Sequence, residues 1–215
     1  MLFKYIILCL GMAFFTLNAL ADPFRLMVMG DSLSAGYHLN KNDSFYMKLE
    51  KALLEKHNDL EIIHFSRSGE TTAGGVQKMN RALAQKPDAV LLELGVNDAL
   101  RDEKTETIAK NLQSIIDTFQ KNNIPVMLIG MQIPFIKPAS YAQKFKQMYV
   151  DLAQKNNLIL YPFFMDGLFH GSGLIALNLP NENLLSDRLH PSAKGVDIMV
   201  KNILPTVNRF LKSIR

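Results

Sequence analysis

The sequence predicts an α/β fold in which helices cover both faces of a parallel sheet of five strands. Short apolar runs alternate along the chain with longer segments whose apolar residues recur at helical spacing. The short runs are almost continuously apolar, as expected for strands that are covered on both faces. The segments between them are long enough to hold the crossover helices that parallel strands require. Together these observations predict a doubly wound sheet.

Five segments have the length and composition of buried strands. The first contains the run Leu26-Met27-Val28-Met29, and the others are similarly rich in aliphatic residues. In chain order we expect strands at Arg25–Gly30, Leu60–Phe65, Asp88–Leu94, Pro125–Met131 and Leu158–Leu160.

Five further segments have the apolar spacing of amphipathic helices. They are Ser44–His57, Thr72–Lys86, Thr105–Lys121, Ser140–Asn156 and Ala193–Lys212. The last of them contains Pro205, where a helix can bend. Residues Pro162 to Leu189 have no regular pattern, and a loop of this length in a compact domain is usually functional. No repeat or linker divides the chain, so we expect a single domain over residues 22–215.

The first 21 residues have the three parts of a secretory signal peptide. Met1-Leu2-Phe3-Lys4 is a short basic start, Tyr5 to Thr16 is almost wholly apolar, and Ala19-Leu20-Ala21 is a small-residue cleavage site. A membrane anchor is the competing interpretation, but the apolar run is shorter than the roughly 20 residues needed to span a bilayer. We therefore expect cleavage after Ala21 and a periplasmic or secreted protein.

The composition excludes several kinds of chemistry. The chain has one cysteine, Cys9, which lies inside the predicted signal peptide. The mature chain would then have no disulfide, no catalytic thiol and no thiolate metal site. Its 48% hydrophobic and 20% charged residues are ordinary for a soluble domain. The net charge of +4 is too small and too dispersed to indicate nucleic-acid binding, although it weakly favours anionic substrates or transient contact with an anionic membrane surface.

A serine directly after the first predicted strand is the leading candidate for a nucleophile. Gly30-Asp31-Ser32-Leu33 would deliver a hydroxyl to the carboxyl end of the sheet, where open α/β folds have their active sites. Serine needs a base, and Asp187-Arg188-Leu189-His190 has a carboxylate and an imidazole at i, i+3 spacing. Ser32, Asp187 and His190 are therefore the candidate triad. Taken singly, each has a simpler interpretation as a turn or capping residue.

Two other strand ends carry candidate donors for an oxyanion. Gly69 follows the second strand and can present its backbone N–H outward from a tight turn. Asn97, in Gly95-Val96-Asn97-Asp98, follows the third strand and supplies a side-chain amide. With the backbone N–H of Ser32 they would form an oxyanion hole, whereas we expect a structural role for Asp98.

The ordered set of motifs resembles the SGNH, or GDSL, hydrolase family. The resemblance covers essentially the whole mature chain and is greatest to the periplasmic multifunctional acyl-CoA thioesterase I/lysophospholipase/arylesterase group. It implies a flavodoxin-like three-layer α/β/α fold and metal-independent hydrolysis of esters and thioesters. It also implies that Ser32, Asp187 and His190 are catalytic and that Gly69 and Asn97 are oxyanion donors. The matching blocks are Gly30–Tyr37, Glu93–Asp98, Leu160–Met165 and Asp187–Pro191.

Two departures from the family leave the substrate open. Val96 stands where close relatives often have glycine, and Leu174–Leu185 is longer and richer in leucine than the matching loop. Phe135 and Leu177 lie in apolar segments that would either pack locally or bind an acyl chain. We expect a small acyl ester, thioester or lysophospholipid as substrate, no cofactor or metal, and a monomer.

Two alternatives remain open from the sequence. One is an esterase that removes O-acetyl groups from a carbohydrate or cell wall, although the chain has no Trp to stack on sugars. The other is a non-catalytic lipid-binding module, which would be expected to lose a triad or oxyanion residue. Gly171–Ala176 formally fits a dinucleotide-binding fingerprint, but no predicted strand precedes it, so we reject that interpretation.

Overall fold

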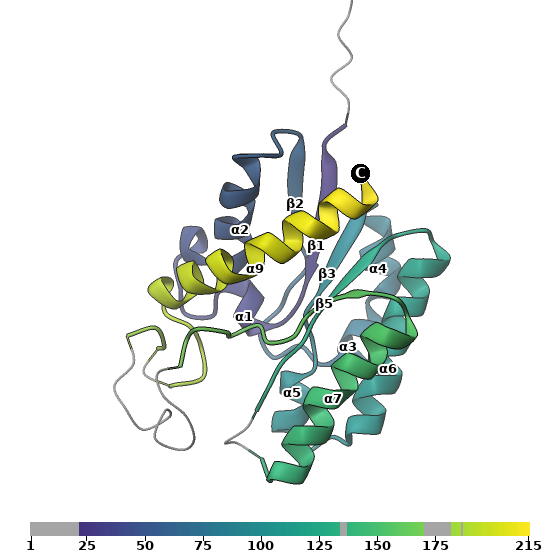
Figure 1. Ribbon diagram of the computed structural model, residues 1–215, viewed down its shortest axis with the longest axis vertical. Coiled ribbons are helices and arrows are strands. Elements are labelled where there is room, and N and C mark those ends of the chain that lie inside the picture. Colours follow the sequence, from purple (N-terminus) through teal and green to yellow (C-terminus); the bar gives the residue numbers. More distant parts are fainter. Residues whose placement is uncertain (1–21, 134–136, 170–181, 186) are drawn as a thin grey trace, which may run out of the picture.

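Five parallel strands form one sheet in the computed structural model, which describes residues 22–133, 137–169, 182–185 and 187–215 (Figure 1). The order of the strands is β2-β1-β3-β4-β5, and every neighbouring pair is parallel. This confirms the predicted α/β class and its five-stranded parallel sheet. The predicted signal peptide lies outside the described residues. The strands are β1 (Phe24–Met29), β2 (Leu60–His64), β3 (Ala89–Leu92), β4 (Val126–Ile129) and β5 (Ile159–Tyr161).

The order in which the chain adds strands to the sheet changes direction after β2, so the switch point lies between β1 and β3. The chain runs outward from β1 to β2, then returns past β1 to β3 and continues to β4 and β5. The carboxyl ends of β1 and β3 are level, because Met29 pairs with Leu92 and Glu93 N donates to Met29 O (2.8 Å). Connections leave these two strands toward opposite faces, and open α/β sheets bind ligands at such a switch point.

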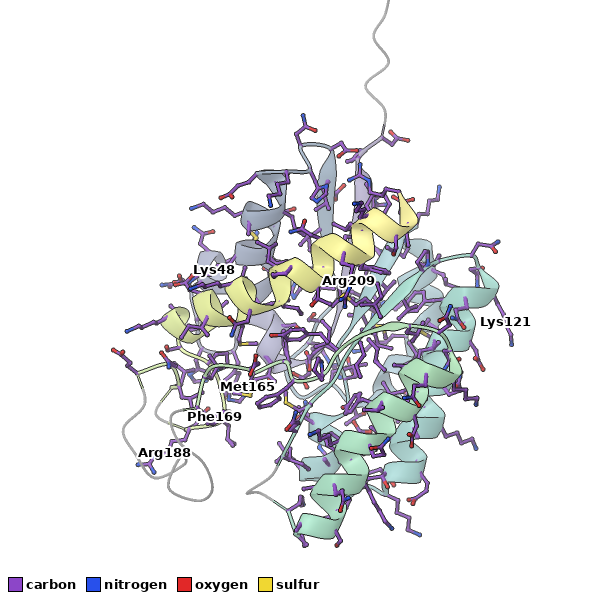
Figure 2. The ribbon with its side chains drawn as sticks, viewed as in Figure 1. Lys48, Lys121, Met165, Phe169, Arg188 and Arg209 are labelled. Carbon is purple, nitrogen blue, oxygen red and sulfur yellow. The ribbon has the colours of Figure 1, made fainter. Side chains whose placement is uncertain are left out.

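Helices cover both faces of the sheet and give the molecule three layers (Figure 1). On one face lie α2 (Phe45–Leu54) and α9 (Ala193–Ile214), and Lys48 of α2 joins them by donating to the Ala193 carbonyl (2.8 Å) and to Asp197 (2.7 Å; Lys48 is labelled in Figure 2). The other face carries α3 (Thr72–Gln77), α4 (Met79–Ala84), α6 (Thr105–Lys121) and α7 (Ala139–Lys155). Three short helices connect elements: α1 (Ser32–Ala35), η1 (Lys41–Asp43) and α5 (Val96–Leu100).

Two details of the predicted elements are wrong. The expected helix Thr72–Lys86 is two helices, α3 and α4, that meet at Lys78, whose ammonium binds the buried carboxylate of Glu70. Two consecutive glycines, Gly74 and Gly75, weaken the helix before this point. Strand β2 is also not wholly buried, since it lies at the edge of the sheet and exposes Glu61 and His64.

The last helix and the core agree with the sequence pattern. Helix α9 continues through Pro205 to Ile214, so the proline does not end it. Every residue of β3 and β4 is buried, as the continuous apolar runs predict. Among the described residues, no helix is both long enough and apolar enough to cross a membrane.

Candidate active site

Ser32 is the first residue of α1, directly beyond the end of β1. Asp31 caps this one-turn helix by accepting the Leu33 N–H at Oδ1 (2.9 Å). Gly36 ends it in the left-handed conformation (φ 77°). The chain just before Ser32 is closely packed, since a Cβ at Gly30 would lie 2.6 Å from a carboxylate oxygen of Glu93 and from Ser34 Oγ. Ser32 itself is 7% exposed.

The predicted base and acid meet Ser32 in a continuous chain of hydrogen bonds. His190 Nε2 lies 2.8 Å from Ser32 Oγ, and His190 Nδ1 lies 2.7 Å from Asp187 Oδ2. Ser32 and His190 are 158 residues apart in the sequence. The structure therefore brings the three candidate triad residues together in the order nucleophile, imidazole, carboxylate.

Short-range pairing holds His190 in this position. Leu185 N donates to His190 O (2.8 Å), and Leu184 forms an antiparallel bridge with Pro191. Between the acid and the base, Arg188 adopts positive φ (59°), which turns the chain so that Asp187 and His190 face each other. The side chain of Arg188 extends away from the sheet (Figure 2).

Hydrogen bonds keep the Asp187 carboxyl ionised. Partial burial would raise its pKa, but the hydrogen bonds from the backbone N–H groups of His190 and Leu189, together with the His190 side chain, outweigh burial and lower it. The two N–H groups donate to Oδ1 at 3.0 and 2.9 Å. An ionised carboxylate can only accept, so Nδ1 of His190 carries the proton and Nε2 is free to accept the proton of Ser32.

Tyr37 is a residue of this site to which the sequence assigned no role. Its ring lies against the imidazole of His190, with the ring centroids 4.4 Å apart and the planes tilted by 36°. The contact depends on the turn at Gly36, after which Tyr37 N donates to Ser32 O (3.1 Å). No spacing in the sequence indicates it, because the partner lies far along the chain.

Gly69 lies in a tight turn after β2, as the sequence predicts. Glu70 N donates to Arg67 O (3.0 Å), which closes a turn with Gly69 at its third position and with φ 76°. This φ at this position is typical of a type II turn. Arg67 N donates to Gly30 O (3.1 Å), which ties the turn to the end of β1. Within the described part of the chain, neither the Gly69 N–H nor the Ser32 N–H has an acceptor.

Asn97 contacts Asp31, the residue before Ser32, from the end of β3. It lies on α5, and its Nδ2 donates to Asp31 Oδ2 (3.1 Å). The next residue, Asp98, binds elsewhere: it accepts from Thr72 N (2.9 Å) and Thr72 Oγ1 (2.5 Å). Asp98 therefore fixes the start of α3, in agreement with the structural role expected for it, and Asn97 alone of this pair faces Asp31.

Two buried carboxyl groups belong to Asp31, the residue before Ser32, and to Glu93, which contacts Asp31. Glu93 Oε2 accepts from Asp31 N (3.2 Å) and from Ser34 Oγ (2.8 Å), and Asp31 is completely buried. Burial raises the pKa of Asp31 to about 7. Burial and the neighbouring charge of Asp31 raise the pKa of Glu93 well above its usual value.

These shifts predict that the protein loses stability as the pH rises. Unfolded Glu93 releases its proton near its usual pKa of 4.5, whereas folded Glu93 keeps it to much higher pH. Between these values the folded chain binds more protons, so raising the pH lowers the free energy of unfolding. In Glu93→Gln the oxygen can still accept both hydrogen bonds. We expect this variant to gain stability over the wild type progressively from pH 5 to pH 8 in urea denaturation. A difference that is constant with pH would contradict the buried pair.

The two candidate substrate-binding residues, Phe135 and Leu177, lie outside the described residues. The same holds for most of the leucine-rich segment 174–185 and for Gly171–Ala176. That these apolar segments bind an acyl chain therefore stays a prediction.

The sequence also matches the model of a protein family. Residues 28–198 match the model of the GDSL-like Lipase/Acylhydrolase family. This stretch includes all the candidate triad and oxyanion residues.

Curated relatives are similar over most of their length. The chain is 30% identical to "Esterase TesA" of Pseudomonas aeruginosa, over 94% of this chain and 96% of that protein. It is 34% identical to "Arylesterase" of Vibrio mimicus, over 85% of this chain and 88% of the relative. It is 28% identical to "Thioesterase 1/protease 1/lysophospholipase L1" of Escherichia coli K12, over 85% of each.

The same similarity is found among solved structures. The crystal structure of TesA superposes with a TM-score of 0.78 at 29% identity, covering 86% of this chain and 99% of that one. The fold and the sequence thus point to one group of enzymes.

Proposed function

Since this chain belongs to the GDSL-like lipase/acylhydrolase family, and is therefore a carboxylic ester hydrolase, we propose that it works through a triad of Ser32, His190 and Asp187. The observation that carries this proposal is the unbroken chain of hydrogen bonds from Ser32 Oγ through the imidazole to Asp187. A serine hydroxyl becomes a nucleophile only beside a base that is itself oriented by a third group.

In the first half of the proposed reaction, Ser32 Oγ attacks the acyl carbonyl carbon while its proton moves to His190 Nε2. The carbonyl oxygen becomes an oxyanion in the tetrahedral intermediate. Donors for it are the backbone N–H groups of Ser32 and Gly69 and the side-chain amide of Asn97. Asp187 stabilises the imidazolium and keeps the proton of Nδ1 in place.

In the second half, the imidazolium returns its proton to the leaving alcohol or thiol as the carbon–heteroatom bond breaks. The acyl group remains on Ser32 as an ester. Water then attacks this acyl-enzyme with His190 again acting as the base, and the products are a carboxylic acid and free Ser32. Each proton taken up by His190 is returned, so the cycle balances without a cofactor.

We propose small acyl esters, aryl esters, acyl thioesters and lysophospholipids as the substrate class. The names of the relatives support this range, since they include an esterase, an arylesterase and a thioesterase/lysophospholipase. The apolar composition of the segments around Phe135 and Leu177 supports an acyl-binding wall. We also propose a monomer, and the small positive net charge supports only transient contact with an anionic membrane surface.

A series of nitrophenyl esters from C2 to C10, with acyl-CoA and lysophospholipid, tests the substrate class. Each buried methylene contributes up to about 0.8 kcal/mol, or about fourfold in rate, so kcat/KM is expected to rise with chain length until the binding site is filled. Phe135→Asp and Leu177→Asp should flatten this profile while leaving acetyl ester hydrolysis nearly unchanged.

Other outcomes favour the two alternatives. A steady decline in kcat/KM from C2 to C10, with release of acetate from acetylated polysaccharide, would support an O-acetyl esterase. Binding of lysophospholipid without turnover of any ester would support a lipid-binding module.

We also propose that the protein is exported and cleaved after Ala21. The basic start, the apolar run and the small residues before Asp22 support this. The mass of the protein recovered from the periplasm or medium is expected to match a chain that begins at Asp22. A cell-associated protein with its full N-terminus would contradict export.

A further inference from the structure

Asp31 makes more contacts than a helix cap needs. Its Oδ1 accepts the Leu33 N–H (2.9 Å) that a cap must satisfy, and this leaves Oδ2 for a second partner, the Asn97 amide (3.1 Å). Serine, threonine or asparagine could provide the first contact without burying a charge. Burying a carboxylate completely costs free energy. The second contact, which only a carboxylate at this position makes, is therefore the feature to be explained.

The second contact determines which way the Asn97 side chain faces. A carboxylate only accepts hydrogen bonds, so the amide must turn its nitrogen, not its oxygen, toward Asp31. The side-chain nitrogen carries two hydrogens. Asp31 holds one of them, and because the amide is planar the direction of the other is then fixed. In the described part of the chain no other group accepts from this nitrogen.

The backbone of Asn97 is held by other contacts. Leu94 O accepts from the buried hydroxyl of Tyr149 (2.9 Å), and Gly95 (φ 126°) lies so close to that hydroxyl that a Cβ there would be 2.5 Å from it. Asn97 O accepts from Arg101 N (3.2 Å) at the end of α5. Loss of the Asp31 contact would therefore free the Asn97 side chain while leaving its backbone in place.

We propose that Asp31 is a positioning residue for the oxyanion hole: its Oδ2 holds one N–H of Asn97 so that the other is directed at the oxyanion formed on Ser32. The inference deepens the proposed function, on which it rests. The same carboxylate also caps the helix that presents Ser32, so one side chain aligns the nucleophile and a donor that lies 66 residues away.

A double-mutant cycle between Asp31 and Asn97 tests the proposal. Asn97→Ala removes the donor, and we expect it to lower kcat by about 10²–10³-fold with little change in KM. In Asp31→Asn the side-chain oxygen still accepts from Leu33 N, but the side-chain nitrogen now faces Asn97. Asn97 then turns its oxygen, not its nitrogen, toward residue 31. We expect a similar fall in kcat, and we expect the double variant to be no slower than Asn97→Ala. The assays are run at pH 8, where Asp31 is largely ionised.

A buried carboxylate beside Asn97 provides the matched control. Asp98→Asn removes a comparable group that binds Thr72 and makes no contact with the Asn97 amide. We expect its effect on kcat to multiply with that of Asn97→Ala, because the two act independently. Asp31→Ser serves as a second test variant: it keeps a cap, loses the contact with Asn97 and removes a buried charge, so loss of folding is not expected.

The outcomes separate the inference from the function on which it rests. If Asn97→Ala keeps full kcat, the proposed oxyanion role of Asn97 fails. If Asn97→Ala is slow but Asp31→Asn and Asp31→Ser are as fast as the wild type, the positioning role fails. It also fails if the Asp31 and Asn97 effects multiply.

Discussion

Ser32→Ala is expected to lower ester turnover by about 10⁴–10⁶-fold and to abolish covalent labelling by a fluorophosphonate. The only atom removed is the hydroxyl oxygen that His190 Nε2 approaches at 2.8 Å. The capping of α1 by Asp31 uses the backbone N–H of Leu33 and does not depend on this hydroxyl. The variant should therefore keep the circular dichroism and unfolding midpoint of the wild type, and the loss can be assigned to chemistry.

Ser34 provides the matched control for Ser32. It lies on the same helical turn, is completely buried, and directs its hydroxyl to Glu93 (2.8 Å) and not to the imidazole. Ser34→Ala is expected to keep labelling at Ser32, whatever its effect on stability. Labelling that survives in Ser32→Ala would assign the nucleophile to another residue.

The second large effect is expected at the base. His190→Ala removes the group that accepts the proton of Ser32, and we expect kcat to fall by about 10⁴–10⁶-fold. Asp187→Asn leaves the geometry intact but can no longer act as a pure acceptor for Nδ1–H, and we expect a loss of up to about 10⁴-fold. Because the three residues act as a unit, Ser32→Ala combined with His190→Ala should be little slower than either variant alone.

His38 is the control for His190. Its ring centroid lies 4.0 Å from that of Tyr37, the residue that also contacts His190, and among the described residues His38 has no hydrogen bond to Ser32. His38→Ala is expected to change kcat less than tenfold. A His190→Ala variant with kcat within tenfold of the wild type would exclude the imidazole as the base.

The fold was predictable where a single local signal decides the outcome. Continuous aliphatic runs indicate buried strands, and β3 and β4 are buried along their whole length as these runs imply. The division of one predicted helix into α3 and α4 was not predictable, because it depends on a contact between Lys78 and Glu70 across a turn. The short helices α1 and α5 were also missed, since one turn gives no periodicity to detect.

The candidate site was predictable as a set of residues but not as a network. Ser32, Asn97 and His190 each follow from the ends of predicted elements or from a short spacing. The contacts of Asn97 with Asp31 and of Tyr37 with His190 join residues far apart in the chain, and they are set by the parallel register of β1 with β3 and by the turn at Gly36. Such contacts are properties of the packed fold and leave no signature in the linear sequence.

The most direct measurement is the position of a fluorophosphonate adduct in the mature protein. Trypsin releases the peptide from Leu26 to Lys41, which contains Ser32 and Ser34, and tandem mass spectrometry distinguishes the two serines. A Ser32 nucleophile predicts one adduct per chain, on Ser32, with loss of esterase activity in proportion to its formation. An adduct on any other residue, or full activity after complete modification of Ser32, would contradict it.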